Sequence, residues 1–170
     1  MPETELEHLR RQTLAYQLAA DDMGQAMAAA MALRDEEDDR NLMLALECAI
    51  AVCYMRAFTK STLMTVPQKF VPAISRGYSE QEVALHQWFR EHRDSAYAHT
   101  DKDSGRIAAV LPLENGSGGV GWSLGWEPFP REWINPAIKL FLRQRELFRA
   151  KALELEAKIK AFGQRSGSAD

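Results

Sequence analysis

The sequence has no apolar run long enough to cross a membrane. Its longest apolar run covers the fourteen residues from Leu42 to Met55 and is interrupted by Glu47. Because a membrane-spanning helix needs about 20 apolar residues, this run predicts a buried core helix instead. The first residues are acidic and lack the apolar stretch of a signal peptide. The sequence therefore favours a cytoplasmic protein with no membrane partner.

The sequence also has few cysteines and no excess of positive charge. Cys48 and Cys53 are the two cysteines, and on one predicted helix they point in different directions, which argues against a disulfide between them. They fit no metal-binding spacing and are typical of small core residues in a reducing compartment. The net charge of −3 and the pI near 5.8 argue against a protein that coats long nucleic acid, but they allow a local basic cleft.

The main pattern in the sequence is the helical spacing of its apolar residues. Apolar residues recur every three or four positions from about Glu3 to Leu33, and again from Ile134 to Phe162. The segment from about residue 39 to 58 is apolar nearly all round, which predicts a central helix. The acidic run Asp35–Asp39 is expected to form the N-terminal end of that helix, where carboxylates favour the free N–H groups and the helix dipole.

A further helix begins at a capping box, in which Ser79 is the N-cap and Glu82 lies at the third helical position. Residues 60–76 are expected to be a connection, and 106–111 and 120–124 two short strands around a glycine-rich loop. We therefore expect an all-α, up-and-down bundle of four long helices with a small β-hairpin-like insertion before the last helix. Residues 1–163 would form a single domain, and residues 164–170 a disordered tail.

Glu47 is the charged exception in the second predicted helix. A buried carboxylate needs a partner or a raised pKa. A pair with an arginine of a neighbouring helix, such as Arg145, is the structural interpretation. The functional interpretation is that Glu47 orients Arg93 or His99.

The segment from Arg93 to Asp101 carries the chemistry that points to a function. Its sequence is RDSAYAHTD, with five residues between Arg93 and His99. Arginine is a permanent planar cation that binds phosphate through two parallel hydrogen bonds, and histidine can move a proton near neutral pH. These two groups are the minimum for cutting RNA without a metal.

This segment resembles the R-x(4–6)-H motif of HEPN domains, in which a polar residue follows the arginine and an Ala-His pair precedes a small polar residue and an acid. Here these are Asp94, Ala98-His99, Thr100 and Asp101. The resemblance implies a helical, homodimeric, metal-independent endoribonuclease of a defence or toxin–antitoxin system. Its partners would be an RNA substrate and an antitoxin protein, and no cofactor or metal is implied. Some members of this family are inactive or bind nucleotides.

The candidate residues have separate roles. His99 would be the general acid/base, and Arg93 would bind the scissile phosphate and stabilise charge in the transition state. Asp94 would hold Arg93 or contact the substrate, and Tyr97 would stack on a base or form a hydrogen bond through its hydroxyl near the cleft. His92 is a core residue, an interface residue or an auxiliary phosphate contact.

On a straight helix, six steps of about 100° leave Arg93 and His99 roughly 120° apart. Either the helix loosens near His99, or two chains contribute to one cleft, which favours a homodimer. Two alternatives stay open: a non-catalytic helical interaction protein, and a small-ligand or nucleotide-binding bundle with Trp122 and Trp126 over a pocket. The other histidine of the third helix, His86, is expected at the surface.

Overall fold

The computed structural model describes residues 5–59, 77–96, 107–112, 118–123 and 128–166. Within these ranges the chain is mostly helical, which confirms the all-α class at that level. The helices are α1 (Glu5–Asp35), α2 (Arg40–Arg56), α4 (Glu80–Ala96) and α5 (Ile134–Ser166), and the short 3-10 helix η1 (Arg131–Trp133) precedes α5.

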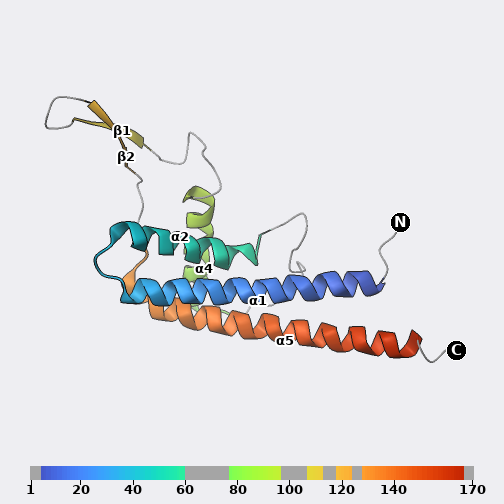
Figure 1. Cartoon of the computed structure of the whole chain (residues 1–170). Helices are drawn as coiled ribbons and strands as arrows, with labels where there is room; N and C mark the ends of the chain where they lie inside the picture. Colours follow the sequence, from blue (N-terminus) through green and yellow to red (C-terminus); the bar gives the residue numbers. More distant parts are fainter. Residues whose placement is uncertain (1–4, 60–76, 97–106, 113–117, 124–127, 167–170) are drawn as a thin grey trace.

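Three of the helices lie along one another and the fourth crosses them. α1 and α5 are antiparallel neighbours over most of their length, and α2 packs on α1 with the opposite direction (Figure 1). α4 crosses behind α2 in this view, so its C-terminal end projects beyond α2, away from α1 (Figure 1). The up-and-down arrangement thus describes α1, α2 and α5, whereas α4 departs from it.

The acidic run between α1 and α2 forms the N-cap of α2, as predicted. Asp39 Oδ1 accepts hydrogen bonds from the backbone N–H groups of Asn41 and Leu42, at 2.9 and 3.0 Å. The Glu36 carboxylate accepts from the N–H groups of Asp38 and Asp39, at 3.1 and 3.0 Å. The two Asp39 bonds satisfy donors that the first turn of α2 leaves without a partner.

Arg131 ties the start of the last helical segment to the end of α1. Its guanidinium donates to the carbonyl oxygen of Leu33 at 2.7 Å and to that of Glu36 at 2.6 Å. A cation at the C-terminal end of a helix satisfies free carbonyls and favours the helix dipole. One side chain thereby joins two parts of the chain that are nearly a hundred residues apart.

The core lies where α5 and α2 meet α1. Ala19, Ala20, Ala26 and Ala30 on α1 are buried, and their small side chains let the neighbouring helices approach closely. Larger side chains fill the space between the helices, and full burial of each contributes about 1.5–3 kcal/mol. The large side chains with under 2% exposure include Met23, Tyr54, Phe89, Phe141 and Phe148.

The second helix is less central than its composition suggested. Its buried residues begin at Glu47, and Leu42 in its first turn keeps 43% of its surface exposed. α1 has the longer contact with α5, which lies along most of it (Figure 1).

Two short strands lie between α4 and α5 in the sequence. β1 (Ile107–Pro112) and β2 (Gly118–Ser123) pair antiparallel, with Val110 opposite Val120. The expected connection at 60–76 lies outside the described residues. The expected disordered tail was wrong for residues 164–166, because α5 continues to Ser166.

Candidate functional site

α4 carries the candidate site, and its N-terminal end is fixed by the predicted capping box. The Ser79 N–H donates to Glu82 Oε2 at 2.7 Å, and the Glu82 N–H donates to Ser79 Oγ at 3.3 Å. Leu85 and Phe89 are fully buried, and Trp88 is 9% exposed. The cap and these apolar side chains set the rotation of α4, and hence the direction of every later side chain.

Arg93 lies in the last turn of α4 and is half-buried. It follows the buried Phe89 by one helical turn, so it lies at the edge of the packed face, as the sequence predicted. The backbone of Asp94 belongs to the same turn, whereas its side chain is outside the described part of the structure. Tyr97 and His99 also lie outside the described residues. The structure therefore places the arginine of the motif and leaves its relation to the histidine untested.

His92 is part of the packed structure beside the motif. Its ring stacks on Trp88 with centroids 3.5 Å apart and 16° between the planes, and its Nδ1 lies 2.9 Å from the Trp88 carbonyl oxygen. A carbonyl only accepts, so Nδ1 donates this hydrogen bond. Among the predicted roles of His92, these contacts favour that of a core residue that supports the last turns of α4.

Glu47 is buried, at 6% exposure, but the predicted pair with Arg145 is wrong. Glu47 Oε1 accepts from the backbone N–H of Phe129 at 3.2 Å. The Arg145 guanidinium instead lies against α1, where a Cβ at Gly24 would come within 3.5 Å of Arg145 Nε. The Arg145 guanidinium therefore packs beside Gly24 of α1.

Phe129 connects Glu47 to the helix that carries the motif. Its ring stacks on Phe89 with centroids 5.5 Å apart and meets Trp88 edge-on at 4.8 Å. Glu47 therefore supports α4 through the segment before α5. Whether Glu47 also orients Arg93 or His99 stays a prediction.

A polar cluster that the sequence did not reveal lies between α2 and α4. The Tyr54 hydroxyl is 3.0 Å from His86 Nδ1 and 3.3 Å from the Tyr78 hydroxyl. His86 was expected at the surface, yet it is half-buried and also meets Phe58 edge-on at 5.0 Å. The reason is that α4 crosses α2, which widens the buried face of α4 to include His86 next to Leu85.

The charges of this cluster favour a structural role. Burial raises the pKa of Tyr54 well above its usual value and that of Tyr78 to about 12. Burial and the nearby Arg90 lower the pKa of His86. At neutral pH the tyrosines therefore keep their protons and His86 is uncharged. Arg143 closes the cluster, with Nη1 3.0 Å from Glu82 Oε1 and the guanidinium carbon 5.3 Å from the centre of the Tyr78 ring.

The described residues give little support to a metal site, a disulfide or a membrane-spanning helix. No group of three or more His, Cys, Asp or Glu side chains among them could hold a metal ion, and neither Cys48 nor Cys53 forms a disulfide. No described helix is long and apolar enough to cross a membrane. The Trp122 side chain and Trp126, which the ligand-binding alternative requires, lie outside what the structure describes.

Searches against family models, curated proteins and solved structures found no match to this chain. An assignment of function therefore depends on the motif and on the way α4 presents it.

Proposed function

We propose that this protein is a HEPN-type, metal-independent endoribonuclease in which Arg93 and His99 act on RNA. The position of Arg93 carries the proposal. It is a half-buried cation in the last turn of a helix that is capped at one end and packed through Phe89 and Trp88 along its length. A phosphate-binding group on such a rigid element loses little freedom when substrate binds.

The proposed reaction is transfer of the phosphate to the 2′-hydroxyl of the same nucleotide. His99 accepts the proton of the 2′-hydroxyl, whose oxygen attacks the adjacent phosphorus while the bond to the 5′-oxygen breaks. A proton then reaches the departing 5′-oxygen. Arg93 binds the non-bridging oxygens and stabilises the charge that develops on them. The products are a 2′,3′-cyclic phosphate and a 5′-hydroxyl, with Asp94 holding Arg93 and Tyr97 stacking on a base.

The proposal includes a homodimer with facing motifs, in which one chain supplies Arg93 and the other His99 to the same cleft. It also includes an antitoxin protein as partner and a role in phage defence or a toxin–antitoxin pair. Mixing Arg93→Ala protein with His99→Ala protein tests the shared cleft. Recovered cleavage after subunit exchange is expected, because a mixed dimer contains one complete site. No recovery, from mixed dimers shown to have formed, would place both residues of a site in one chain.

The activity itself is tested with total cellular RNA in EDTA. Wild type should cleave it, and Arg93→Ala and His99→Ala should each lower the rate by about 10²–10⁴-fold while the helical circular dichroism is unchanged. Arg90→Ala, an exposed arginine three residues before Arg93, is the matched control for loss of one positive charge. DNA should stay intact because it lacks the 2′-hydroxyl. A wild type that cuts no RNA would leave the non-catalytic interaction protein as the better account.

A further inference from the structure

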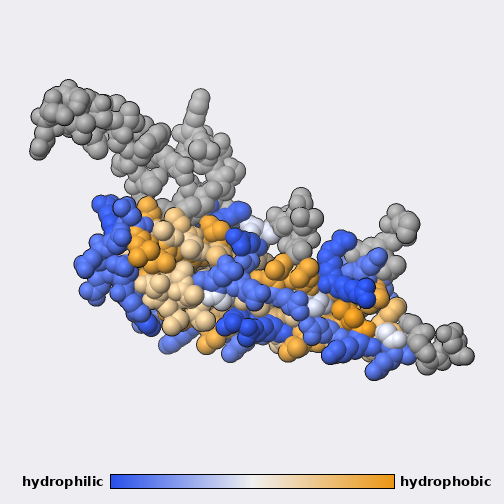
Figure 2. Space-filling model, in the orientation of Figure 1, coloured by the Kyte–Doolittle hydropathy of each residue, from blue (hydrophilic) through white to orange (hydrophobic). Residues whose placement is uncertain are grey.

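α1 and α5 continue as a two-helix arm beyond the other helices (Figure 1). Arg56, the last residue of α2, pairs with Asp22 at 2.9 Å. The part of α1 before Asp22 and the part of α5 that packs beside it therefore extend past the end of α2. Figure 2 shows hydrophobic surface between hydrophilic residues along this arm. A helix pair alone buries only the strip where its two members meet, so its outer faces need another partner if they are apolar.

The outer face of α1 has a second helix seam, opposite the one that packs in the core. Two of its positions are Leu14 and Leu18, each 41% exposed. The seam follows the alternating three- and four-residue spacing that helices use to pack against a partner. Its members are Glu7, Arg11, Leu14, Leu18, Asp21 and Gln25, all exposed.

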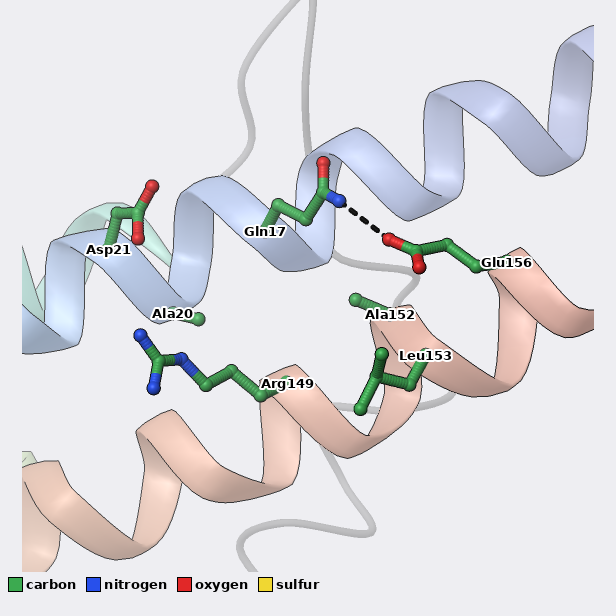
Figure 3. Close-up of a pocket in the computed structure, with 7 residues that line it drawn as sticks. All are labelled: Gln17, Ala20, Asp21, Arg149, Ala152, Leu153 and Glu156. Atoms are coloured by element: carbon green, nitrogen blue, oxygen red, sulfur yellow. Dashed lines mark hydrogen bonds between the residues drawn. The ribbon is translucent and has the colours of Figure 1, made fainter.

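A shallow groove between α1 and α5 adjoins this seam. Gln17 Nε2 donates to Glu156 Oε1 at 2.8 Å across it, and the Arg149 side chain reaches from α5 toward α1 (Figure 3). Leu153 lines the same groove and is 65% exposed, the highest value among the exposed large apolar side chains of the described residues. The groove thus adds apolar surface of α5 to the leucine pair of α1.

We propose that this outer face of α1, together with Leu153, docks against the same face of a second copy of the chain. The order of residues along the seam favours a second copy over another partner. This order is self-complementary about a two-fold axis that would cross the exposed face of α1 at the level of residue 16. In an antiparallel pair, Leu14 meets Leu18 of the other copy, and Arg11 comes opposite Asp21. An interface about a two-fold axis needs this kind of match.

The interface would join the two arms into a four-helix bundle with two helices from each copy. The leucines supply the apolar centre, and the Arg11–Asp21 pairs on either side set the register. This surface differs from the motif end of α4, which projects beyond α2 away from α1 (Figure 1). The inference does not depend on ribonuclease activity. If the facing-motif dimer also forms, the assembly would have four chains.

Sedimentation velocity over a micromolar to submillimolar concentration series tests the interface. Leu18→Asp should halve the mass of the assembly, because two buried leucines per interface become charged, and should raise the dissociation constant more than about 100-fold. Leu147→Asp is the matched control, since Leu147 is 42% exposed but lies on another face of α5. It should leave the mass unchanged.

A charge exchange separates a specific interface from general loss of structure. Asp21→Arg should weaken association by about tenfold, because it places like charges opposite each other at two symmetric positions. Adding Arg11→Asp to the same chain should restore the affinity. A wild type that stays monomeric, a Leu18→Asp protein that keeps its mass, or a charge exchange without recovery would each overturn the proposal, whether or not the protein cuts RNA.

Discussion

Gln144 offers a direct test of how the core is packed. It lies on α5 between Phe141 and Phe148 with 0% exposure, and neither atom of its amide has a hydrogen-bond partner among the described residues. A buried polar group without a partner costs about 1–3 kcal/mol. Met has nearly the same shape and length, and such a swap usually costs less than about 1.5 kcal/mol in packing. We therefore expect Gln144→Met to stabilise the fold by about 1–2 kcal/mol.

Thermal unfolding followed by circular dichroism measures this change. For a chain of this size, each kcal/mol moves Tm by about 2–4 °C, so Gln144→Met should melt roughly 2–8 °C above wild type. Gln144→Glu is the control, since it keeps the shape but adds a group that burial would force to stay protonated, and it should melt below wild type. If Gln144→Met melts at or below wild type with the same helical content, the amide is satisfied in solution and the reasoning is wrong.

Three further substitutions test other contacts. Arg131→Ala should destabilise the protein by about 1.5–3 kcal/mol in urea unfolding, because the carbonyls at the end of α1 lose a charged donor; a change under about 0.5 kcal/mol would show that the clamp contributes little. Glu47→Ala should cost about 1–3 kcal/mol, because the buried Phe129 N–H loses its acceptor, and Glu47→Gln clearly less, since glutamine keeps one; equal losses would contradict this role. Because the pKa of His86 is lowered in the fold, the unfolded chain binds a proton more readily than the folded one. The Tm of wild type should therefore fall as the pH drops below about 6.5, and the Tm of His86→Gln should fall less. Parallel curves of Tm against pH would refute this role of His86.

The sequence predicted the local features of the fold well, because each depends on residues close together in the chain. The N-cap at Asp39 and the capping box of Ser79 and Glu82 are determined within four residues. The buried seam of α5 follows from spacing alone and includes Phe141 and Phe148, as expected. These patterns need no knowledge of which helix lies beside which.

Features that depend on how helices cross were missed. Glu47 and Arg145 seemed a plausible pair, but the Arg145 guanidinium lies beside Gly24 of α1 instead. The burial of His86 follows from the crossing of α4 over α2, which no local pattern determines. The structure places Arg93 at the edge of the packed face, as its spacing from Phe89 indicated, and the position of His99 stays a prediction.

The ends of the cut RNA test the central claim most directly. Purified wild type should cleave a defined single-stranded RNA in EDTA and leave 2′,3′-cyclic phosphate and 5′-hydroxyl ends, and His99→Ala should leave the RNA intact. These ends are expected because the 2′-hydroxyl is the nucleophile and His99 accepts its proton. No cleavage by wild type, products with 3′-hydroxyl ends, or equal cleavage by His99→Ala would contradict the account.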